Sequence, residues 1–350
     1  MQKPIIGREK ITEITTLLHD INAVNVVVFH GRHSFDKHKQ MFQVLLSKYN
    51  VTFYSDFDPN PKKEQILIAI DKLKHIKCDA IIAFGGGSVI DFTKAFRFYS
   101  NLKAPLIAIP TTAGTGSEAT QFAVVYVNGV KTSLDNNAIL PDYAIIDCQF
   151  AELAPQYVKA CSAMDAYSQA IESYWSVLST IKSRHYAKQA IILIKDNIEK
   201  FVLESNKTSS ENMAIAAHLA GQAINISRTT AAHALSYTLT SKYGIPHGHA
   251  VALSLANLFI ENSKVNSENC NDKRGTIFVQ RRINDILHIL DQKTAQDFAT
   301  YWYDLMSKIG MKYNIADIGI KNKKIIIENI NAQRMANNPV KLSNIDNLLR

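Results

Sequence analysis

The first half of the chain alternates short apolar runs with longer mixed segments. Residues 24–30 and 79–84 are mostly apolar, rich in valine and isoleucine, and each run ends at a glycine, which is typical of buried strands. The segment 62–77 has the mixed composition of a helix, and Asp58-Pro59-Asn60-Pro61 predicts a turn because its prolines continue neither a strand nor a helix. Strands that alternate with helices favour a largely parallel sheet covered by helices.

The same pattern continues to about residue 150. Residues 105–109 and 143–147 predict two further buried strands. Between them, residues 122–127 and 130–134 are joined by Asn128-Gly129, a strong signal for a two-residue β-hairpin turn. We therefore expect a hairpin beside the parallel sheet.

Beyond about Pro155 the pattern changes to long helical segments with few strands. Residues 164–175 predict an amphipathic helix, and residues 231–243 predict a helix that ends at Tyr243-Gly244-Ile245-Pro246. The expected organisation is an α/β domain over residues 1–153 and an all-helical domain over residues 154–350, a division that suits 350 residues.

Composition narrows the function classes. The chain has 39 basic and 31 acidic residues, a formal charge of +8, but no dense basic block, which disfavours nucleic-acid binding and fits an anionic small molecule. The four cysteines form no C-x-x-C pair, which indicates a reducing compartment. We see no signal peptide and no apolar run of about 18 residues, so we expect a cytoplasmic protein without a membrane span.

Two glycine-rich turns follow neighbouring strands. Gly85-Gly86-Gly87-Ser88 follows the strand over 79–84, and Thr111–Ser117 follows the strand over 105–109. Because the carboxyl ends of parallel strands meet at one edge of a sheet, where nucleotides bind, the two turns together predict a dinucleotide site. A tight strand–helix turn is the alternative for the first segment.

The first strand is followed by Gly31-Arg32. A carboxylate that would hold the ribose 2′-hydroxyl of NAD(H) is absent at this place, and a guanidinium that would accept a 2′-phosphate is present. This predicts NADP(H) in preference to NAD(H), unless Arg32 is simply a solvated loop residue.

Candidate metal ligands lie in the second half. His233 falls inside the predicted helix over 231–243, and His247 lies fourteen residues later, just past its end. Asp165 offers a carboxylate, and Gln169 lies four residues on, hence on the same helix face. Imidazole and carboxylate are common ligands of first-row metals. The alternatives are two ordinary histidines and an aspartate favoured by the dipole of its helix.

These segments together resemble the iron-containing, group III alcohol dehydrogenases, in order over almost the whole chain. The matching motifs are GGGSVIDFTKA (85–95), IPTTAGTGSE (109–118), the Lys131 hairpin, MDAYSQAIESY (164–174), two histidines ending in PHG (233–248) and NNP (337–339). The resemblance implies an N-terminal dinucleotide-binding α/β domain with a largely parallel sheet and an all-α C-terminal metal-binding domain, an architecture shared with dehydroquinate synthase. It also implies a homodimer.

The resemblance supplies the expected site residues. The cofactor set comprises Gly31, Arg32, Asn60, Gly86, Gly87, Ser88, Asp91, Thr111, Thr112, Thr115, Ser117 and Lys131. The expected ligands of one divalent metal, Fe(II) or Zn(II), are Asp165, Gln169, His233 and His247. Two positions depart from the family pattern, because Gln169 and Tyr237 stand where the family commonly has histidines. An amide weakens a metal site, but three protein ligands plus water or substrate suffice for a catalytic ion.

With these two departures, the chain resembles the branch of the family that reduces phosphonoacetaldehyde to 2-hydroxyethylphosphonate. Arg228 and Thr229, directly before the helix that carries His233, are the expected clamp for an anionic substrate, with Arg184 as a second candidate. Surface or interdomain ion pairs are the alternative for both arginines. In the expected reaction the metal polarises the aldehyde, NADPH delivers a hydride, and Tyr237 and His249 are candidates for a proton relay.

Three other functions stay open on the sequence. The same fold could act on an uncharged short-chain aldehyde, lactaldehyde or a polyol. It could also be a dehydroquinate-synthase-like lyase that uses NAD without net oxidation. Gln169 further allows a non-catalytic descendant that binds no metal.

Overall fold

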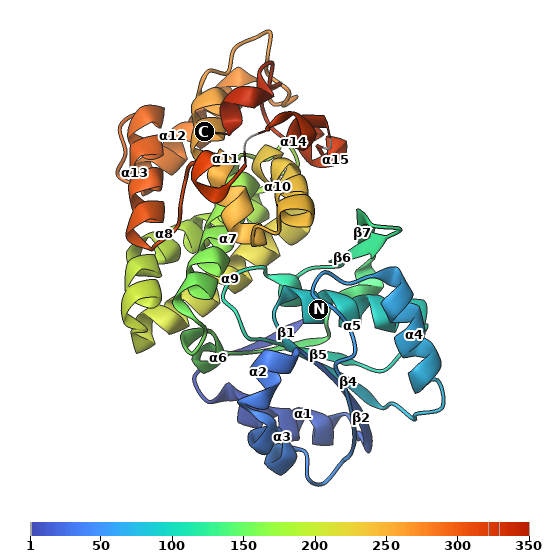
Figure 1. The fold of residues 1–350 in the computed structure, drawn as a ribbon. Coiled ribbons are helices and arrows are strands. Elements are labelled where there is room, and N and C mark those ends of the chain that lie inside the picture. The colour runs from blue at the N-terminus through green and yellow to red at the C-terminus, as the bar shows by residue number, and fades with distance from the viewer. Residues whose placement is uncertain (1, 321, 329, 350) are drawn as a thin grey trace. The chain divides into compact units, whose positions relative to one another are not determined.

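The computed structural model describes residues 2–320, 322–328 and 330–349. The chain divides into two compact units, residues 1–154 and 155–350, and each is described by itself. Figure 1 shows strands and helices alternating in the first unit and helices in the second.

A six-stranded sheet forms the centre of the first unit. Its strands are β1 (Lys3–Gly7), β2 (Asn25–His30), β3 (Asn50–Tyr54), β4 (Ala80–Gly85), β5 (Leu106–Pro110) and β8 (Tyr143–Asp147). They lie in the order β1-β8-β5-β4-β2-β3, and every pair is parallel. The prediction of a largely parallel sheet is confirmed.

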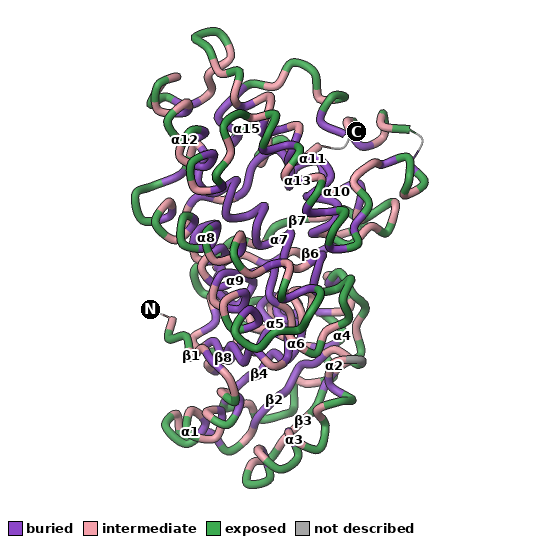
Figure 2. Tube along the Cα trace, turned by 90° about the vertical axis from the view of Figure 1, so that its left-hand side faces the viewer, coloured by how far each residue is buried: buried purple, intermediate pink, exposed green. Residues whose placement is uncertain are grey.

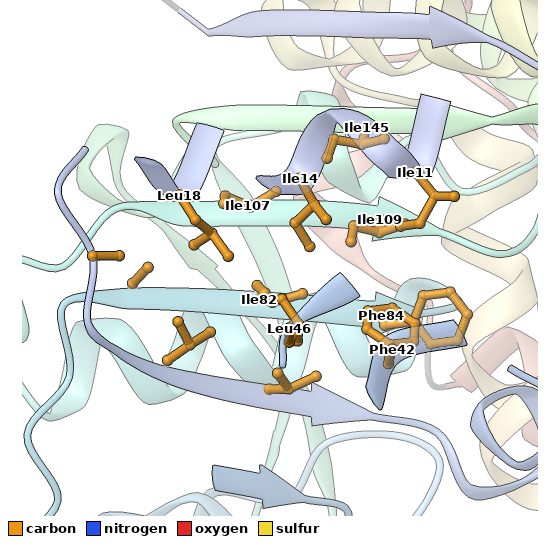
Figure 3. Close-up of a cluster of buried hydrophobic side chains, with 14 of the residues drawn as sticks. Ile11, Ile14, Leu18, Phe42, Leu46, Ile82, Phe84, Ile107, Ile109 and Ile145 are labelled. Carbon is orange, nitrogen blue, oxygen red and sulfur yellow. The ribbon is translucent and has the colours of Figure 1, made fainter. Parts of the chain in front are cut away.

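Helices cover both faces of this sheet. They are α1 (Glu13–Asp20), α2 (Arg32–Asp36), α3 (Lys39–Leu45), α4 (Lys63–Leu73), α5 (Gly87–Tyr99) and α6 (Cys148–Glu152). Successive side chains of a strand point to opposite faces, so β4 feeds two cores. Ile82 and Phe84 pack with residues of α1 and α3 (Figure 3), whereas Ile81 and Ala83 pack with residues of α4 and α5.

The predicted hairpin consists of β6 (Phe122–Val127) and β7 (Val130–Asp135). Asn128 and Gly129 both have positive φ, 50° and 77°, as a type I′ turn requires. This part of the sequence-based prediction is confirmed.

Two features of the first unit were not predicted. β1 has only Ile5 and Ile6 as strong strand formers, and it is stabilised by pairing with β8, which follows about 140 residues later. The sequence after β2 predicts a single helical segment to about Lys48, and this prediction is wrong, because α2 ends at Asp36 and a separate helix, α3, begins at Lys39.

The described residues of the second unit form a helical assembly. Its helices are α7 (Gln156–Trp175), α8 (Ile181–Glu204), α9 (Lys207–Ser227), α10 (Ala231–Tyr243), α11 (His247–Ser263), α12 (Thr276–Ile289), α13 (Ala295–Lys308), α14 (Lys324–Glu328) and α15 (Ala332–Ala336). In this part of the chain the helical prediction is confirmed, and α10 has the predicted bounds. Within the described ranges, no helix combines the length and apolarity that crossing a membrane requires.

The predicted helix over 164–175 is confirmed as part of α7, but the prediction that it is amphipathic is wrong. All residues from Ala163 to Trp175 are buried (Figure 2), because α7 packs against α8, α9 and α11. A helix buried on all sides needs no polar face toward solvent. The polar side chains of α7 between Asp165 and Ser173 therefore face other protein groups.

Candidate metal centre and cofactor site

The two glycine-rich turns of the first unit lie against each other. A Cβ added to Gly87 would be 2.8 Å from both Cγ2 and Oγ1 of Thr115, so only a glycine fits beside this threonine. A Cβ on Gly86 would meet Thr112 at the ordinary distance of 3.8 Å. The backbone of the first turn is thus in close contact with the second turn.

These turns lie at the switch point of the sheet. β2 is followed in sequence by its neighbour β3, but β4 pairs with the other side of β2, and β5 lies beyond β4. Gly31 after β2 donates a backbone hydrogen bond to Phe84 of β4 at 3.3 Å, and the Asn60 amide lies 3.4 Å from Ser88 Oγ. The carboxyl ends of β2 and β4 are where open α/β sheets bind nucleotides.

Helix α5 starts at this edge. Its N-cap is Gly86, which has no side chain to cap the first turn. The positive end of the helix dipole there favours a phosphate group. The structure therefore brings Gly31, Asn60, Gly86, Gly87 and Ser88 to one edge.

Asp91 and Ser117 are used to hold the loops together. Asp91 Oδ1 accepts a hydrogen bond from the Ser117 hydroxyl, and its Oδ2 accepts one from the Val124 amide at 2.8 Å. Burial, the largest effect, raises the pKa of Asp91, and the charges of Lys94 and Lys131 oppose this shift.

A buried lysine also helps to hold these loops together. Lys94 is fully buried, and its ammonium donates to Thr120 Oγ1 at 3.0 Å and to the Phe122 carbonyl at 2.9 Å. Burial lowers the pKa of Lys94 to about 8. Lys94 was not among the predicted site residues. The available signal in the sequence was its position three residues after Asp91, on the same face of the helix.

Arg32 has a carboxylate beside it. Its side chain is 68% exposed, and its guanidinium lies 3.8 Å from Oδ1 of Asp56, which follows β3. Asp56 also forms an ion pair with Lys72, in which Nζ of the lysine lies 2.6 Å from Oδ2 of the aspartate. Sequence reasoning considered only the residues directly after β2, so it missed Asp56.

In the second unit, Asp165, His233 and His247 come together. One ligand atom from each can be chosen so that all three lie within 4.8 Å of one another. His233 Nε2 is 3.4 Å from Asp165 Oδ1, and His247 Nε2 is 4.0 Å from the same oxygen. The three residues come from α7, α10 and α11.

A glycine allows this approach. A Cβ on Gly248 would be 1.9 Å from the carbonyl oxygen of Cys161 and 2.8 Å from Cβ of Asp165. Backbone contact between α7 and α11 is possible only without a side chain here. Gly248 thus brings the start of α11, with His247, to the helix that carries Asp165.

Both imidazole rings are oriented through their Nδ1 atoms. His233 Nδ1 is hydrogen-bonded to Oε2 of Glu172, and His247 Nδ1 lies 3.4 Å from the Ser236 hydroxyl. Each Nε2 therefore faces Asp165. Sequence reasoning assigned no role to Glu172 or Ser236; their positions seven residues after Asp165 and three after His233 were the available signals.

The charges of the Asp165, His233 and His247 side chains favour the binding of a cation. Burial alone would raise the pKa of Asp165, but His247 and His233 outweigh it and lower that pKa, so the carboxyl stays ionised. Among the described residues, Asp165 Oδ1 and His233 Nε2 are buried without hydrogen-bond partners. Ligands about 2.0–2.2 Å from a tetrahedral ion lie about 3.3–3.6 Å apart, close to the 3.4 Å observed between these atoms. The donor set fits a divalent metal.

The comparisons with known proteins agree with this arrangement. The family model "Iron-containing alcohol dehydrogenase" matches residues 2–148, and the model of the C-terminal part of the Fe-containing alcohol dehydrogenase family matches residues 159–348. The chain belongs to the iron-containing alcohol dehydrogenase family. This family consists of oxidoreductases that use a nicotinamide dinucleotide and a divalent metal.

Individual members of the family resemble the chain at moderate identity. A probable alcohol dehydrogenase EutG of Salmonella typhimurium is 31% identical over 73% of this chain and 67% of its own length. A phosphonoacetaldehyde reductase of Streptomyces viridochromogenes is 31% identical over 62% of this chain and 61% of its own length. The matched stretches thus span about two thirds or less of these curated relatives.

A solved structure matches over nearly the whole chain. The sulfoacetaldehyde reductase of Bifidobacterium kashiwanohense, solved in complex with NAD+, superposes with a TM-score of 0.87 at 25% identity and covers 99% of this chain and 95% of its own. The fold of this iron-containing alcohol dehydrogenase family member is thereby confirmed as that of its family.

Gln169 contacts the carboxylate of Asp165. The Gln169 side chain is buried and hydrogen-bonds to Asp165, which lowers the pKa of the aspartate. An amide that hydrogen-bonds a ligating carboxylate holds it in place, so Gln169 has a supporting role available besides that of ligand.

The two relay candidates have different surroundings. Tyr237 is half-buried on α10, one helical turn after His233 and so on the same side of the helix. His249 is buried, with Nδ1 2.8 Å from the Tyr157 hydroxyl and Nε2 2.6 Å from the Lys312 carbonyl. Both nitrogens of His249 are therefore engaged within the protein, and burial lowers its pKa. These contacts favour a packing role for His249 over the predicted proton relay.

The segment predicted to bind the anionic group of the substrate, Arg228-Thr229, has an unusual backbone conformation. Arg228 has φ 61° and ψ 177°, a region that is almost confined to glycine and costs about 1–3 kcal/mol. Asn337 pins the segment by donating to the carbonyls of Ser227 and Thr229, both at 2.9 Å. Thr229 itself is buried. Strain of this kind persists where the surrounding structure holds it and is concentrated at functional sites.

Arg184 lies in another environment. Its guanidinium carbon lies over the ring of Phe278, 5.3 Å from the ring centroid, and burial together with the charges of Arg282 and Arg274 lowers the pKa of Arg184. Its hydrogen bonds run to Ser179, at 3.4 and 3.5 Å. None of these contacts involves the metal cluster or the Arg228 segment, so we do not retain Arg184 as a substrate residue.

Proposed function

We propose that this chain is a metal-dependent, NAD(P)H-linked reductase that converts a small aldehyde with an acidic group, first of all phosphonoacetaldehyde, to the primary alcohol. The observation that carries the proposal is the convergence of Asp165, His233 and His247, with both imidazole Nε2 atoms turned toward one carboxylate oxygen. In this proposal residues 1–154 bind the dinucleotide and residues 155–350 bind the metal and the aldehyde.

The metal would be held by Asp165, His233 and His247, with Gln169 supporting the carboxylate. Two imidazoles and one carboxylate suit Fe(II) and Zn(II), and three protein ligands leave a position open. A bound ion supplies Lewis-acid polarisation of the carbonyl, and the reduced nicotinamide supplies the hydride.

Arg228 would bind the acidic group of the substrate. It follows α9 and lies five residues before His233, and its strained backbone is held by Ser227 and Asn337. A guanidinium pairs with phosphonate or sulfonate oxygens through parallel hydrogen bonds. The names of two similar proteins, phosphonoacetaldehyde reductase and sulfoacetaldehyde reductase, both denote aldehydes with such a group.

Tyr237 would return the proton that the product alcohol needs. Its hydroxyl is carried one helical turn beyond a proposed metal ligand, and a phenol is a competent general acid. The cofactor residues remain as predicted, with Asp91 and Ser117 shaping the loops. Arg32 supports a preference for NADP(H). A homodimer and a cytoplasmic location remain predictions.

The proposal is tested by NADPH and NADH oxidation with phosphonoacetaldehyde, sulfoacetaldehyde and propionaldehyde, with and without Fe(II) or Zn(II). We expect metal-dependent NADPH oxidation with the anionic aldehydes. R228A should raise KM for phosphonoacetaldehyde about 10- to 100-fold, since a charged hydrogen bond contributes about 1.5–3 kcal/mol, and leave propionaldehyde turnover unchanged. R228K is the matched control that keeps the charge.

Other outcomes favour other functions. Faster turnover of propionaldehyde that is insensitive to R228A would select the uncharged-aldehyde alternative. Conversion of a substrate without net NADPH consumption would select the lyase. Purified protein that takes up no metal under any condition would contradict the metal mechanism altogether.

A further inference from the structure

Glu172 is a fully buried carboxylate beside the proposed metal centre, two helical turns after Asp165 on α7. It is not among the three residues whose ligand atoms converge. An ionised carboxylate in a protein interior is costly unless hydrogen bonds compensate for the lost water. The groups that surround Glu172 therefore indicate why it is there.

The two oxygens of Glu172 have separate partners. Oε1 accepts hydrogen bonds from the Thr230 amide at 3.1 Å, the Thr230 hydroxyl at 2.6 Å and the Ala232 amide at 2.9 Å. Oε2 is hydrogen-bonded to Nδ1 of His233. One carboxylate thus links the start of α10 with the imidazole that α10 carries.

The contact at Oε2 fixes the state of the imidazole. A carboxylate oxygen only accepts, so Nδ1 of His233 must carry the hydrogen. In the neutral ring Nε2 then has its lone pair free, and Nε2 is the atom that lies 3.4 Å from Asp165 Oδ1. The ring is thereby held in the tautomer that a metal requires.

The contacts at Oε1 fix the position of the helix. Thr230 is the N-cap of α10, but its own side chain makes no capping bond; its hydroxyl donates to Glu172 instead. Glu172 takes the place of the cap and satisfies amides of the first turn, where a negative charge is also favoured by the helix dipole. The segment Arg228–Thr230 is therefore anchored to the same carboxylate as His233.

We propose that Glu172 is a positioning residue that holds His233 as a metal ligand and ties it to the Arg228–Thr230 segment. The inference rests on the proposed metal centre but not on the identity of the aldehyde. Glu172→Gln tests it with almost no change of shape. The amide side chain of this variant can place its oxygen toward the backbone amides of α10 only by turning its NH2 toward His233 Nδ1, which favours the wrong tautomer.

The readout is metal binding, measured by equilibrium dialysis with Zn(II) and by the absorption spectrum of the Co(II)-loaded protein. We expect E172Q to bind Zn(II) roughly 10- to 100-fold more weakly than wild type, the usual effect of removing a carboxylate behind a histidine ligand, and to change the Co(II) spectrum. S173A is the matched control, since Ser173 is an equally buried polar residue of α7 that hydrogen-bonds to Ser227. S173A should bind metal as wild type does.

The outcomes separate this inference from the proposed function. Wild-type protein that binds no Zn(II) contradicts the metal centre, whereas equal affinity and spectrum in wild type and E172Q overturn only the role of Glu172. If E172Q does not fold, T230V keeps the charge of Glu172 and removes one hydrogen bond to Oε1, together with the bond that the Thr230 hydroxyl accepts from Trp175 Nε1. T230V should then weaken Zn(II) binding by a few-fold, and wild-type affinity in T230V overturns the inference.

Discussion

Gly248 on α11 lies so close to Cys161 on α7 that a Cβ on the glycine would be 1.9 Å from the cysteine carbonyl oxygen. This contact places the start of α11, with His247, beside Asp165. The glycine of the PHG segment is thus explained by packing rather than by backbone conformation.

Gly248→Ala should separate α11 from α7. The backbone carbonyl cannot move aside as a side chain could, so we expect a loss of about 1–3 kcal/mol of folding free energy. The displacement should also reduce metal content, because His247 moves with α11. Urea unfolding and metal analysis of the purified variant measure the two effects. A variant with wild-type stability and full metal content would show that the helices do not pack as described.

Gly87→Ala should push the two cofactor loops apart. Its Cβ would be 2.8 Å from Thr115 Oγ1, whereas a Cβ on Gly86 would meet Thr112 only at 3.8 Å. We expect G87A to lower stability by about 1–3 kcal/mol and to weaken NADPH binding, with metal content unchanged. Thermal unfolding and fluorescence titration with NADPH are suitable measurements.

The neighbouring glycine provides the control for G87A. G86A should change stability by less than about 1 kcal/mol, since the added methyl group has room. The double variant G87A/T115A loses the two 2.8 Å contacts and keeps only a 3.1 Å contact with Cβ of residue 115, so part of the stability should recover. Equal losses in G86A and G87A would argue against the described contact between the loops.

Arg32→Ala should change the choice of cofactor. The guanidinium is mostly exposed and lies beside Asp56, which is already paired with Lys72. Removal of Arg32 should raise KM for NADPH about tenfold or more and leave KM for NADH nearly unchanged, because only NADPH carries the 2′-phosphate. Steady-state kinetics with both cofactors check this. A wild-type preference for NADH would contradict the predicted NADP(H) preference.

Cys78 should react slowly with thiol reagents in the folded protein. Burial raises its pKa from 9.0 to about 11. At pH 8 the thiolate fraction is then about 100-fold smaller than in the unfolded chain. Rates of alkylation at Cys78 in native and denaturant-unfolded protein, read by mass spectrometry, give the comparison.

The same shift of the Cys78 pKa has a consequence for stability. The raised folded pKa means that the native state keeps a proton that the unfolded state loses between pH 9.0 and about 11. The stabilisation is therefore complete below pH 9.0 and is lost as the pH rises through about 11. C78A should show a weaker decline of stability over this alkaline range, and an unchanged decline would contradict the assignment.

His249→Phe distinguishes packing from proton relay. The substitution leaves the Lys312 carbonyl and the Tyr157 hydroxyl without their present partner, which should cost about 1–3 kcal/mol of stability. The turnover of folded, metal-loaded enzyme should stay near that of wild type. A kcat that falls a hundredfold while fold and metal content persist would restore His249 to the mechanism.

The sequence by itself determined the features that depend on neighbouring residues. The strands over 24–30 and 79–84, the Asn128-Gly129 turn and the helix over 231–243 all follow from local apolar pattern and turn chemistry, and the structure has them. The motifs also indicated the family, which the family models confirm. Local patterns are reliable here because each element could bury its apolar face in only a few ways.

Only the tertiary structure decided the features that depend on distant residues. The edge strand β1 forms because β8 offers it backbone partners, and residues 163–175 of α7 are buried because α8, α9 and α11 pack against this helix. Glu172 meets His233 across 61 positions of sequence, and Asp56 meets Arg32 across neighbouring strands. Such contacts arise from how helices and strands pack, and no local propensity encodes them. For that reason the sequence motifs could name the proposed ligand residues, whereas the groups that orient them could not be named.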